Sequence, residues 1–201
     1  MRALILNCTL KQSPTPSNTE ALADVVATAL RQLSVTVETV RLVDLHIPPG
    51  VQTDLGEGDD WPEIHGKLLA SEILVVASPT WLGRPSSIAQ RALERMDAMI
   101  SETDDDGRPV ATDRVAGVVV TGNEDGAHHV ITELDGALGD IGYTIPGQAF
   151  TYWNMGPGPG PDYTDTDHGH DYAERTGKTM AHNLFFVATA LRRHPIPATN
   201  L

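Results

Sequence analysis

The sequence is poor in cysteine and in basic residues, and it has no long apolar run. Cys8 is the only cysteine among 201 residues, so no intrachain disulfide can form and a reducing cytoplasm is the expected setting. Lysine and arginine number 14 against 27 aspartates and glutamates, and this net charge of −13 disfavours nucleic acid or an anionic membrane as a partner. No apolar stretch approaches the roughly 20 residues of a membrane-spanning helix. The acidity also serves solubility, and it identifies no ligand by itself.

Two common nucleotide-binding motifs are missing as well. No G-x-G-x-x-G follows the first expected strand, and no G-x-x-x-x-G-K-[ST] occurs, which disfavours a dinucleotide Rossmann site and a P-loop. Histidines occur at His128, His129 and in the segment 167–171. The adjacent pair would point in different directions on a helix, and the other group lies in an acidic loop. We therefore expect no resident metal.

The sequence does contain a regular alternation of apolar strands and amphipathic helices. The run Ile73–Ala77 is apolar at every position, which is typical of a strand buried on both faces of a parallel sheet. Five strands alternating with five helices predict one α/β domain over residues 1–201, a doubly wound parallel sheet with helices on both faces. The expected strands are 3–8, 35–43, 73–77, 115–120 and 144–150, and the expected helices are 18–33, 63–70, 85–100, 127–138 and 172–193.

Three loops follow the first, third and fourth strands, and in the strand order 2-1-3-4-5 these loops meet at one crevice. The first contains Thr9 and the segment 17–19 at the start of a helix, where unsatisfied N–H groups favour a phosphate, although helix capping alone would explain the same residues. The second carries Trp81, which either lies against a planar ring or packs in the core. The third carries Gly122 and Gly126, which allow close approach to a ligand or mark an ordinary turn.

These loops resemble those of the flavodoxin-like NAD(P)H-dependent FMN reductases over about residues 1–150. The similar segments are CTLK with SNT in the first loop, SPTWLGRPS in the second and TGNEDG in the third. The resemblance implies a flavodoxin-like fold, the FMN phosphate in the first loop and the isoalloxazine ring at the other two. The implied FMN contacts are Thr9, Lys11, Ser17, Asn18, Thr19, Pro79, Thr80, Trp81, Leu82, Gly83, Thr121, Gly122, Asn123, Asp125 and Gly126.

The resemblance also implies an activity. NADH or NADPH would reduce the flavin, and a small acceptor such as a quinone, a nitro or azo compound, a metal chelate or a free flavin would take the electrons. No side chain is then needed as a catalytic acid or base. Lys11 and Arg84 are the nearest basic residues to receive an anionic dinucleotide, and Asp125 is expected to cap the helix after it.

The expected helix 85–100 carries more apolar side chains than one sheet contact needs. We therefore expect a homodimer in which the partner chain helps to close the flavin pocket. The alternative is that Met99 and Ile100 pack beneath the turn at 103–109.

Two other functions fit the same sequence. The first is an electron carrier of the flavodoxin type, whose acidic surface would dock basic redox partners. The second is a flavin-free α/β module that acts in protein interaction. The long loop 151–169, rich in glycine, proline and aspartate, favours an enzyme if it walls a substrate pocket, but it could equally be a surface segment without a role.

Overall fold

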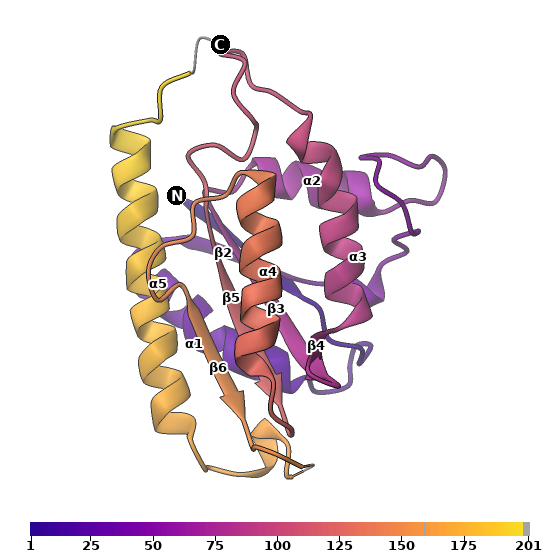
Figure 1. Ribbon diagram of the computed structural model, residues 1–201, viewed down its shortest axis with the longest axis vertical. Coiled ribbons are helices and arrows are strands. Elements are labelled where there is room, and N and C mark those ends of the chain that lie inside the picture. The colour runs from indigo at the N-terminus through magenta and orange to yellow at the C-terminus, as the bar shows by residue number, and fades with distance from the viewer. Residues whose placement is uncertain (159, 199–201) are drawn as a thin grey trace.

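The computed structural model describes residues 1–158 and 160–198, and it shows a parallel sheet between two layers of helices (Figure 1). None of the helices in these ranges is long and apolar enough to cross a bilayer. The elements are β1 (Arg2–Asn7), α1 (Asn18–Gln32), β2 (Thr36–Arg41), η1 (Leu42–Asp44), α2 (Trp61–Leu69), β3 (Ile73–Trp81), β4 (Arg84–Pro85), α3 (Ser87–Met96), η2 (Asp97–Ile100), β5 (Val115–Gly122), α4 (Ala127–Ile141), β6 (Phe150–Asn154), η3 (Tyr163–Asp165) and α5 (His170–Arg193).

The strand order is β2-β1-β3-β5-β6, with all neighbours in this path parallel. Counted among the parallel strands alone, this is the order 2-1-3-4-5, and the predicted flavodoxin-like fold class is confirmed. The two-residue strand β4 was not predicted. It turns back to pair antiparallel with the end of β3, so the second loop is a short hairpin.

Alternate residues of each strand face opposite helical layers. On β1, Leu4 and Leu6 pack into the core beneath α2, α3 and α4, whereas Ala3 and Ile5 pack beneath α1 and α5. Figure 1 shows the two layers, with α5 on one side of the sheet and α3 and α4 on the other. Because both faces are covered, apolar residues occupy successive positions of the central strands, which is why these strands are recognisable in the sequence.

The third strand is longer than predicted. It was expected to stop at Ser78–Pro79, but β3 continues through Pro79 to Trp81. The pairing of β1 with β3 ends at Ala77, whose carbonyl accepts the Cys8 N–H at 2.8 Å. Peptide groups alternate in direction along a strand, so the nitrogen of Pro79 faces this same side, where β1 no longer pairs. The missing N–H of Pro79 therefore removes no hydrogen bond between β3 and β1.

The last strand lies later in the chain than predicted. It was expected at 144–150, but β6 spans Phe150–Asn154 and Thr144 makes only an isolated bridge to Val115. The segment 151–169 is consequently not all loop, because its first four residues continue the sheet. The last helix also begins two residues earlier than the expected Tyr172, at His170.

The connection before α2 is fixed to α3 by a buried ion pair. Arg95 and Asp59 side chains are 0% and 1% exposed, and an Arg95 nitrogen lies 2.6 Å from an Asp59 oxygen. The hydrogen bonds from Arg95 lower the pKa of Asp59 to about 2, because they stabilise its charged form. Arg95 also donates to the carbonyl oxygens of Pro48, Gln52 and Thr53. One arginine thereby satisfies several backbone groups of a segment that has little secondary structure.

The apolar face of α3 is not a free association surface. Met96 and Met99 are fully buried in the core, and Ile88 and Leu93 are partly buried. Only Ile100 is exposed, at 47%. The expected surplus of apolar surface on this helix, from which an interface between two chains was predicted, is therefore not present. The helix uses these side chains to cover its own sheet. The homodimer itself stays a prediction, without this interface.

Candidate functional site

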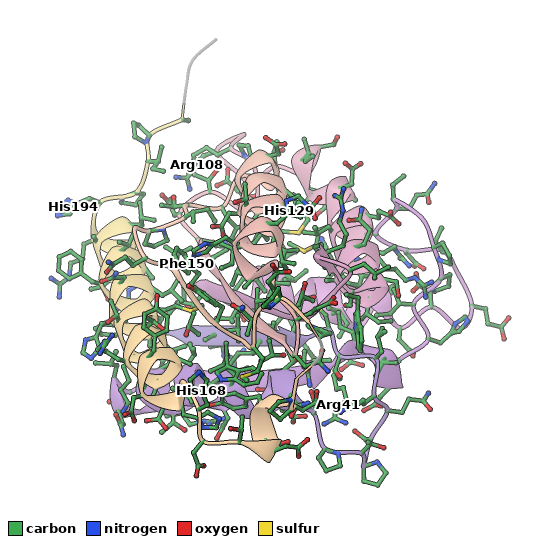
Figure 2. The ribbon with its side chains drawn as sticks, turned by 60° about the horizontal axis from the view of Figure 1, so that its bottom comes forward. Arg41, Arg108, His129, Phe150, His168 and His194 are labelled. Carbon is green, nitrogen blue, oxygen red and sulfur yellow. The ribbon has the colours of Figure 1, made fainter. Side chains whose placement is uncertain are left out.

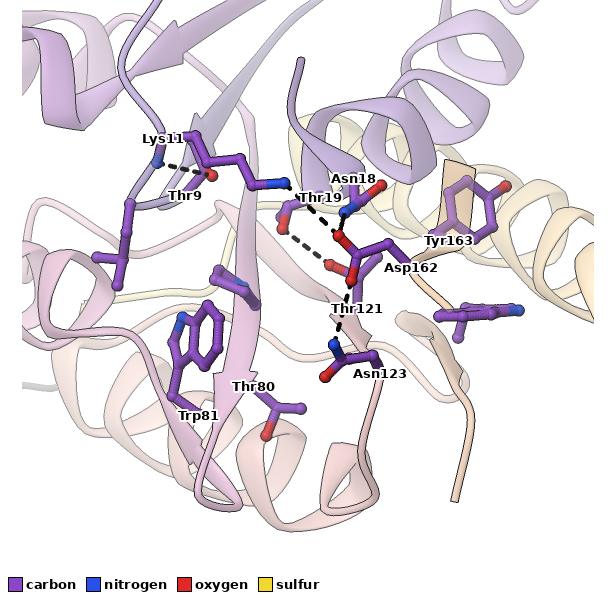
Figure 3. A pocket seen from close by; sticks show the side chains of 14 residues that line it. Thr9, Lys11, Asn18, Thr19, Thr80, Trp81, Thr121, Asn123, Asp162 and Tyr163 are labelled. Atoms are coloured by element: carbon purple, nitrogen blue, oxygen red, sulfur yellow. Dashed lines mark hydrogen bonds and ion pairs between the residues drawn. The ribbon is translucent and has the colours of Figure 1, made fainter. Parts of the chain in front are cut away.

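A cleft opens at the carboxyl ends of β1, β3 and β5, where the three predicted loops meet. Figure 2 turns this end of the molecule toward the viewer, with Arg41 and His168 on opposite sides of it. The predicted contacts that line the cleft are Thr9, Lys11, Asn18, Thr19, Pro79, Thr80, Trp81, Thr121, Gly122 and Asn123 (Figure 3). The predicted contacts outside its lining are Ser17, Leu82, Gly83, Asp125 and Gly126. The lining residues that were not predicted are Leu10, Trp153, Asp162 and Tyr163.

The first loop divides its hydroxyl groups between capping and the cleft. The Ser17 hydroxyl accepts the Glu20 N–H at 3.1 Å and caps α1, which is the alternative that the sequence left open for this residue. The Thr19 hydroxyl instead reaches Thr121 on β5, with 2.8 Å between the two oxygens, and both residues are buried. The N–H groups of Asn18 and Thr19 open the helix and have no acceptor within it, so an anion is favoured there.

The second loop presents Trp81 to the cleft rather than to the core. Its side chain is 50% exposed, at the end of β3 where the chain turns back into β4. Leu82 is 92% exposed, and its N–H donates to a carboxylate oxygen of Glu124 at 2.6 Å, which ties the second loop to the third. The hydroxyl oxygen of Thr80 is buried and has no hydrogen-bond partner among residues 1–158 and 160–198, and it points toward the third loop, where a Cβ on Gly126 would lie 3.5 Å from it. The second loop therefore offers the cleft an aromatic ring, while the Thr80 hydroxyl lies between the second and third loops.

The third loop is pressed against the second. A Cβ on Gly122 would lie 2.2 Å from the Thr80 methyl carbon, and one on Gly126 would lie 2.7 Å from the Gly83 Cα. Gly126 also has a φ of +111°, which other residues rarely adopt. These glycines allow one loop to pack on the other, a role that the sequence did not separate from contact with a ligand. Asp125 is exposed and does not cap α4, because Gly126 occupies the cap position, so that prediction was wrong.

The two basic residues expected near a dinucleotide are both engaged by acidic groups. Arg84 forms an ion pair with Glu133 of α4. The Lys11 ammonium lies 3.6 Å from a carboxylate oxygen of Asp162. A negatively charged ligand at this cleft would therefore compete with carboxylates of the chain itself.

The described residues between β6 and α5 contribute Asp162 and Tyr163 to one wall of the cleft, beside Trp153 of β6. The Met155 N–H donates to the Gly122 carbonyl oxygen at 3.2 Å, which continues the sheet contact into this wall. Tyr163 is buried, stacks on His170 with 4.0 Å between ring centroids, and meets the Trp153 ring edge-on at 5.5 Å. Burial raises the pKa of Tyr163, so its hydroxyl stays protonated. The loop 151–169 was expected to wall a pocket if the protein is an enzyme, but Trp153, Asp162 and Tyr163 were not singled out within it.

The cysteine and the two adjacent histidines, whose side chains are of reactive or metal-binding types, make ordinary structural contacts. Cys8 is fully buried, and burial raises the pKa of its thiol, so it carries no reactive thiolate. His128 packs edge-on against Tyr152 at 4.9 Å, and His129 lies 3.4 Å from Glu133. Within the described part of the chain, no group of three or more histidine, cysteine, aspartate or glutamate residues is arranged to hold a metal ion.

Comparison with known proteins identifies one family, through a match that covers most of the chain. Residues 1–155 match the family described as NADPH-dependent FMN reductase. The 8-demethyl-8-aminoriboflavin-5'-phosphate synthase of Streptomyces davaonensis is 32% identical over 208 residues, which cover 97% of this chain and 80% of that protein. The divalent metal cation transporter MntH of Mycobacterium bovis is 39% identical over 199 residues, or 96% of this chain. The chain spans only 29% of the length of that transporter.

The solved structures agree with the sequence relatives. The crystal structure of RosB with bound 8-demethyl-8-formylriboflavin-5'-phosphate superposes with a TM-score of 0.86 at 32% identity, covering 98% of this chain and 82% of that one. An apo NADH:FMN oxidoreductase superposes with a TM-score of 0.64 at 12% identity, covering 96% of this chain and 91% of that one. At that identity the second likeness shows the fold alone.

Proposed function

Because the chain belongs to the NADPH-dependent FMN reductase family, we propose that it passes hydride from NADPH or NADH through bound FMN to a small electron acceptor. The observation that supports this most is the convergence of the three loops on one cleft, with the half-exposed Trp81 in its lining. An open α/β sheet binds its ligands at this edge. The acceptor belongs to the classes named from the sequence: quinones, nitro or azo compounds, metal chelates and free flavins.

The cleft offers a suitable group for each part of FMN. The N–H groups at the start of α1 and the Lys11 ammonium suit the phosphate, because a helix N-terminus favours an anion. The half-exposed Trp81 ring suits the planar isoalloxazine. FMN, when bound, supplies the hydride chemistry, so the side chains need only bind, orient and exclude water.

Trp153 and Tyr163 give the cleft an aromatic wall within one chain, beside any contribution from a partner chain. A reductase needs a walled site to align nicotinamide with flavin, and this chain supplies an aromatic wall of its own. The homodimer and the cytoplasmic setting remain proposals. The activity of any longer protein that contains such a domain, as the Mycobacterium relative does, is outside this proposal.

A second candidate function is supported by the Streptomyces relative. That protein is named for the synthesis of a modified flavin phosphate, and the RosB structure holds a formyl flavin phosphate. By analogy, the flavin would be the substrate of this chain rather than its cofactor. The electron-carrier alternative is supported only by the net charge of −13.

Mass analysis of the flavin separates the first two candidates. The purified protein is incubated in air with FMN and NADPH, the protein is precipitated with acid, and the released flavin is weighed by mass spectrometry. We expect unchanged FMN while NADPH is oxidised, because a cofactor is regenerated at each turnover. A new flavin mass that requires the protein would favour the second candidate instead.

A further inference from the structure

The Asp162 carboxylate accepts hydrogen bonds from side chains that line the cleft. One of its oxygens accepts a hydrogen bond from the Asn18 amide at 2.8 Å, and the other accepts one from the Asn123 amide at 3.2 Å. The Lys11 ammonium lies 3.6 Å from the same carboxylate. Figure 3 shows that Asp162 reaches from the wall segment between the first loop and the third. The carboxylate therefore spans two of the three predicted flavin loops.

The wall segment holds Asp162 in this position from both sides. Its neighbour Tyr163 is buried between Trp153 and His170. The Asn18 side-chain oxygen, in turn, accepts the N–H of Thr164 at 3.1 Å and its hydroxyl at 2.7 Å. Asn18 thus binds both the carboxylate and the backbone next to it. The contact is a built part of the fold rather than a chance position of a surface side chain.

The donors that bind Asp162 are those that a flavin phosphate would need. Asn18 opens α1, and Lys11 is the cation of the cleft lining. A carboxylate and a phosphate on the same ammonium and amide repel each other, and neither then has the full set of donors. Riboflavin has the same ring and ribityl chain but no phosphate, so it creates no such conflict.

We propose that Asp162 sets the discrimination between FMN and phosphate-free riboflavin, because FMN must displace its carboxylate from Lys11 and Asn18. This inference rests on the proposed function, in which the start of α1 holds the FMN phosphate. The native carboxylate lowers the affinity for FMN and leaves the affinity for riboflavin almost unaffected.

Calorimetric titration of the apoprotein with FMN and with riboflavin tests this proposal. Asp162→Asn keeps the shape and removes the charge, and we expect it to tighten FMN about fivefold or more, while riboflavin changes by less than about twofold. Asp162→Ala should act in the same direction, since it also removes the charge. Asp167→Asn is the matched control, because it removes one exposed charge from the same segment, and it should leave both affinities unchanged.

The outcomes separate this inference from the function on which it rests. If the wild-type protein binds FMN but Asp162→Asn leaves FMN unchanged or weakens both flavins alike, the inference is overturned and the proposed function stands. An equal gain from Asp167→Asn would also overturn it, because general acidity would then explain the effect. A wild-type protein that binds no FMN would overturn both.

Discussion

Replacing Arg95 by alanine is expected to lower the free energy of unfolding by about 3–5 kcal/mol, because the change leaves the buried Asp59 carboxylate without its partner. Among the described residues, Asp59 would keep only the N–H groups of Leu55 and Trp61, each at 3.0 Å. The carbonyl oxygens of Pro48, Gln52 and Thr53 would also lose their donor. Urea unfolding at neutral pH measures the loss.

Arg91 provides the matched control for this prediction. It lies one helical turn earlier on α3 and donates a single hydrogen bond, to the Ile47 carbonyl oxygen at 3.1 Å. Arg91→Ala should cost about 1 kcal/mol, the usual net contribution of one such bond. Equal losses from the two variants would show that the buried ion pair does not fix the segment before α2.

Replacing Thr19 by alanine is expected to weaken FMN binding by about 10- to 150-fold, because a hydrogen bond to a charged group contributes ~1.5–3 kcal/mol. Thr19 lies at the start of α1, lines the cleft, and holds Thr121 on β5 with 2.8 Å between the two hydroxyl oxygens. The substitution removes a donor at the anion site and leaves the buried Thr121 hydroxyl without this partner. Titration of the apoprotein with FMN measures the effect, and Thr19→Ser should restore most of the affinity.

Ser17 separates loss of the ligand contact from loss of the helix cap. Its hydroxyl caps α1 and is not part of the cleft lining. Ser17→Ala should therefore lower the stability by about 1 kcal/mol with little change in FMN affinity. The assignment of the phosphate to the start of α1 would be wrong if Thr19→Ala bound FMN as tightly as the wild-type protein.

The strands and the loops that follow them were predictable because they depend on local patterns, whereas the strand order came from the flavodoxin-like arrangement. Apolar runs at 73–77 and 115–120 mark strands buried on both faces, and polar loops follow each of them. The last strand was misplaced because Phe150–Asn154 runs directly into a segment rich in glycine and proline. The alternation of buried and partly buried residues along β6 is set by its pairing with β5, which the sequence does not show.

The contacts of the wall were not predictable because they join distant parts of the chain, although the loop 151–169 itself was offered as a pocket wall. Asn18 and Asp162 are 144 positions apart, and no local pattern links them. The roles of the glycines depend in the same way on how the strands are paired. A side chain at Gly122 has no room only because Thr80 of the neighbouring strand lies against that position. Sequence patterns therefore located the loops, while the contacts between loops required the structure.

Anaerobic stopped-flow mixing of the FMN-loaded protein with NADPH, and separately with NADH, tests the central claim most directly. At least one nicotinamide should bleach the visible flavin absorbance in a single two-electron phase, with one nicotinamide oxidised for each flavin. The account would be contradicted if neither nicotinamide reacted and chemical reduction of the flavin paused at one electron, since that behaviour belongs to an electron carrier.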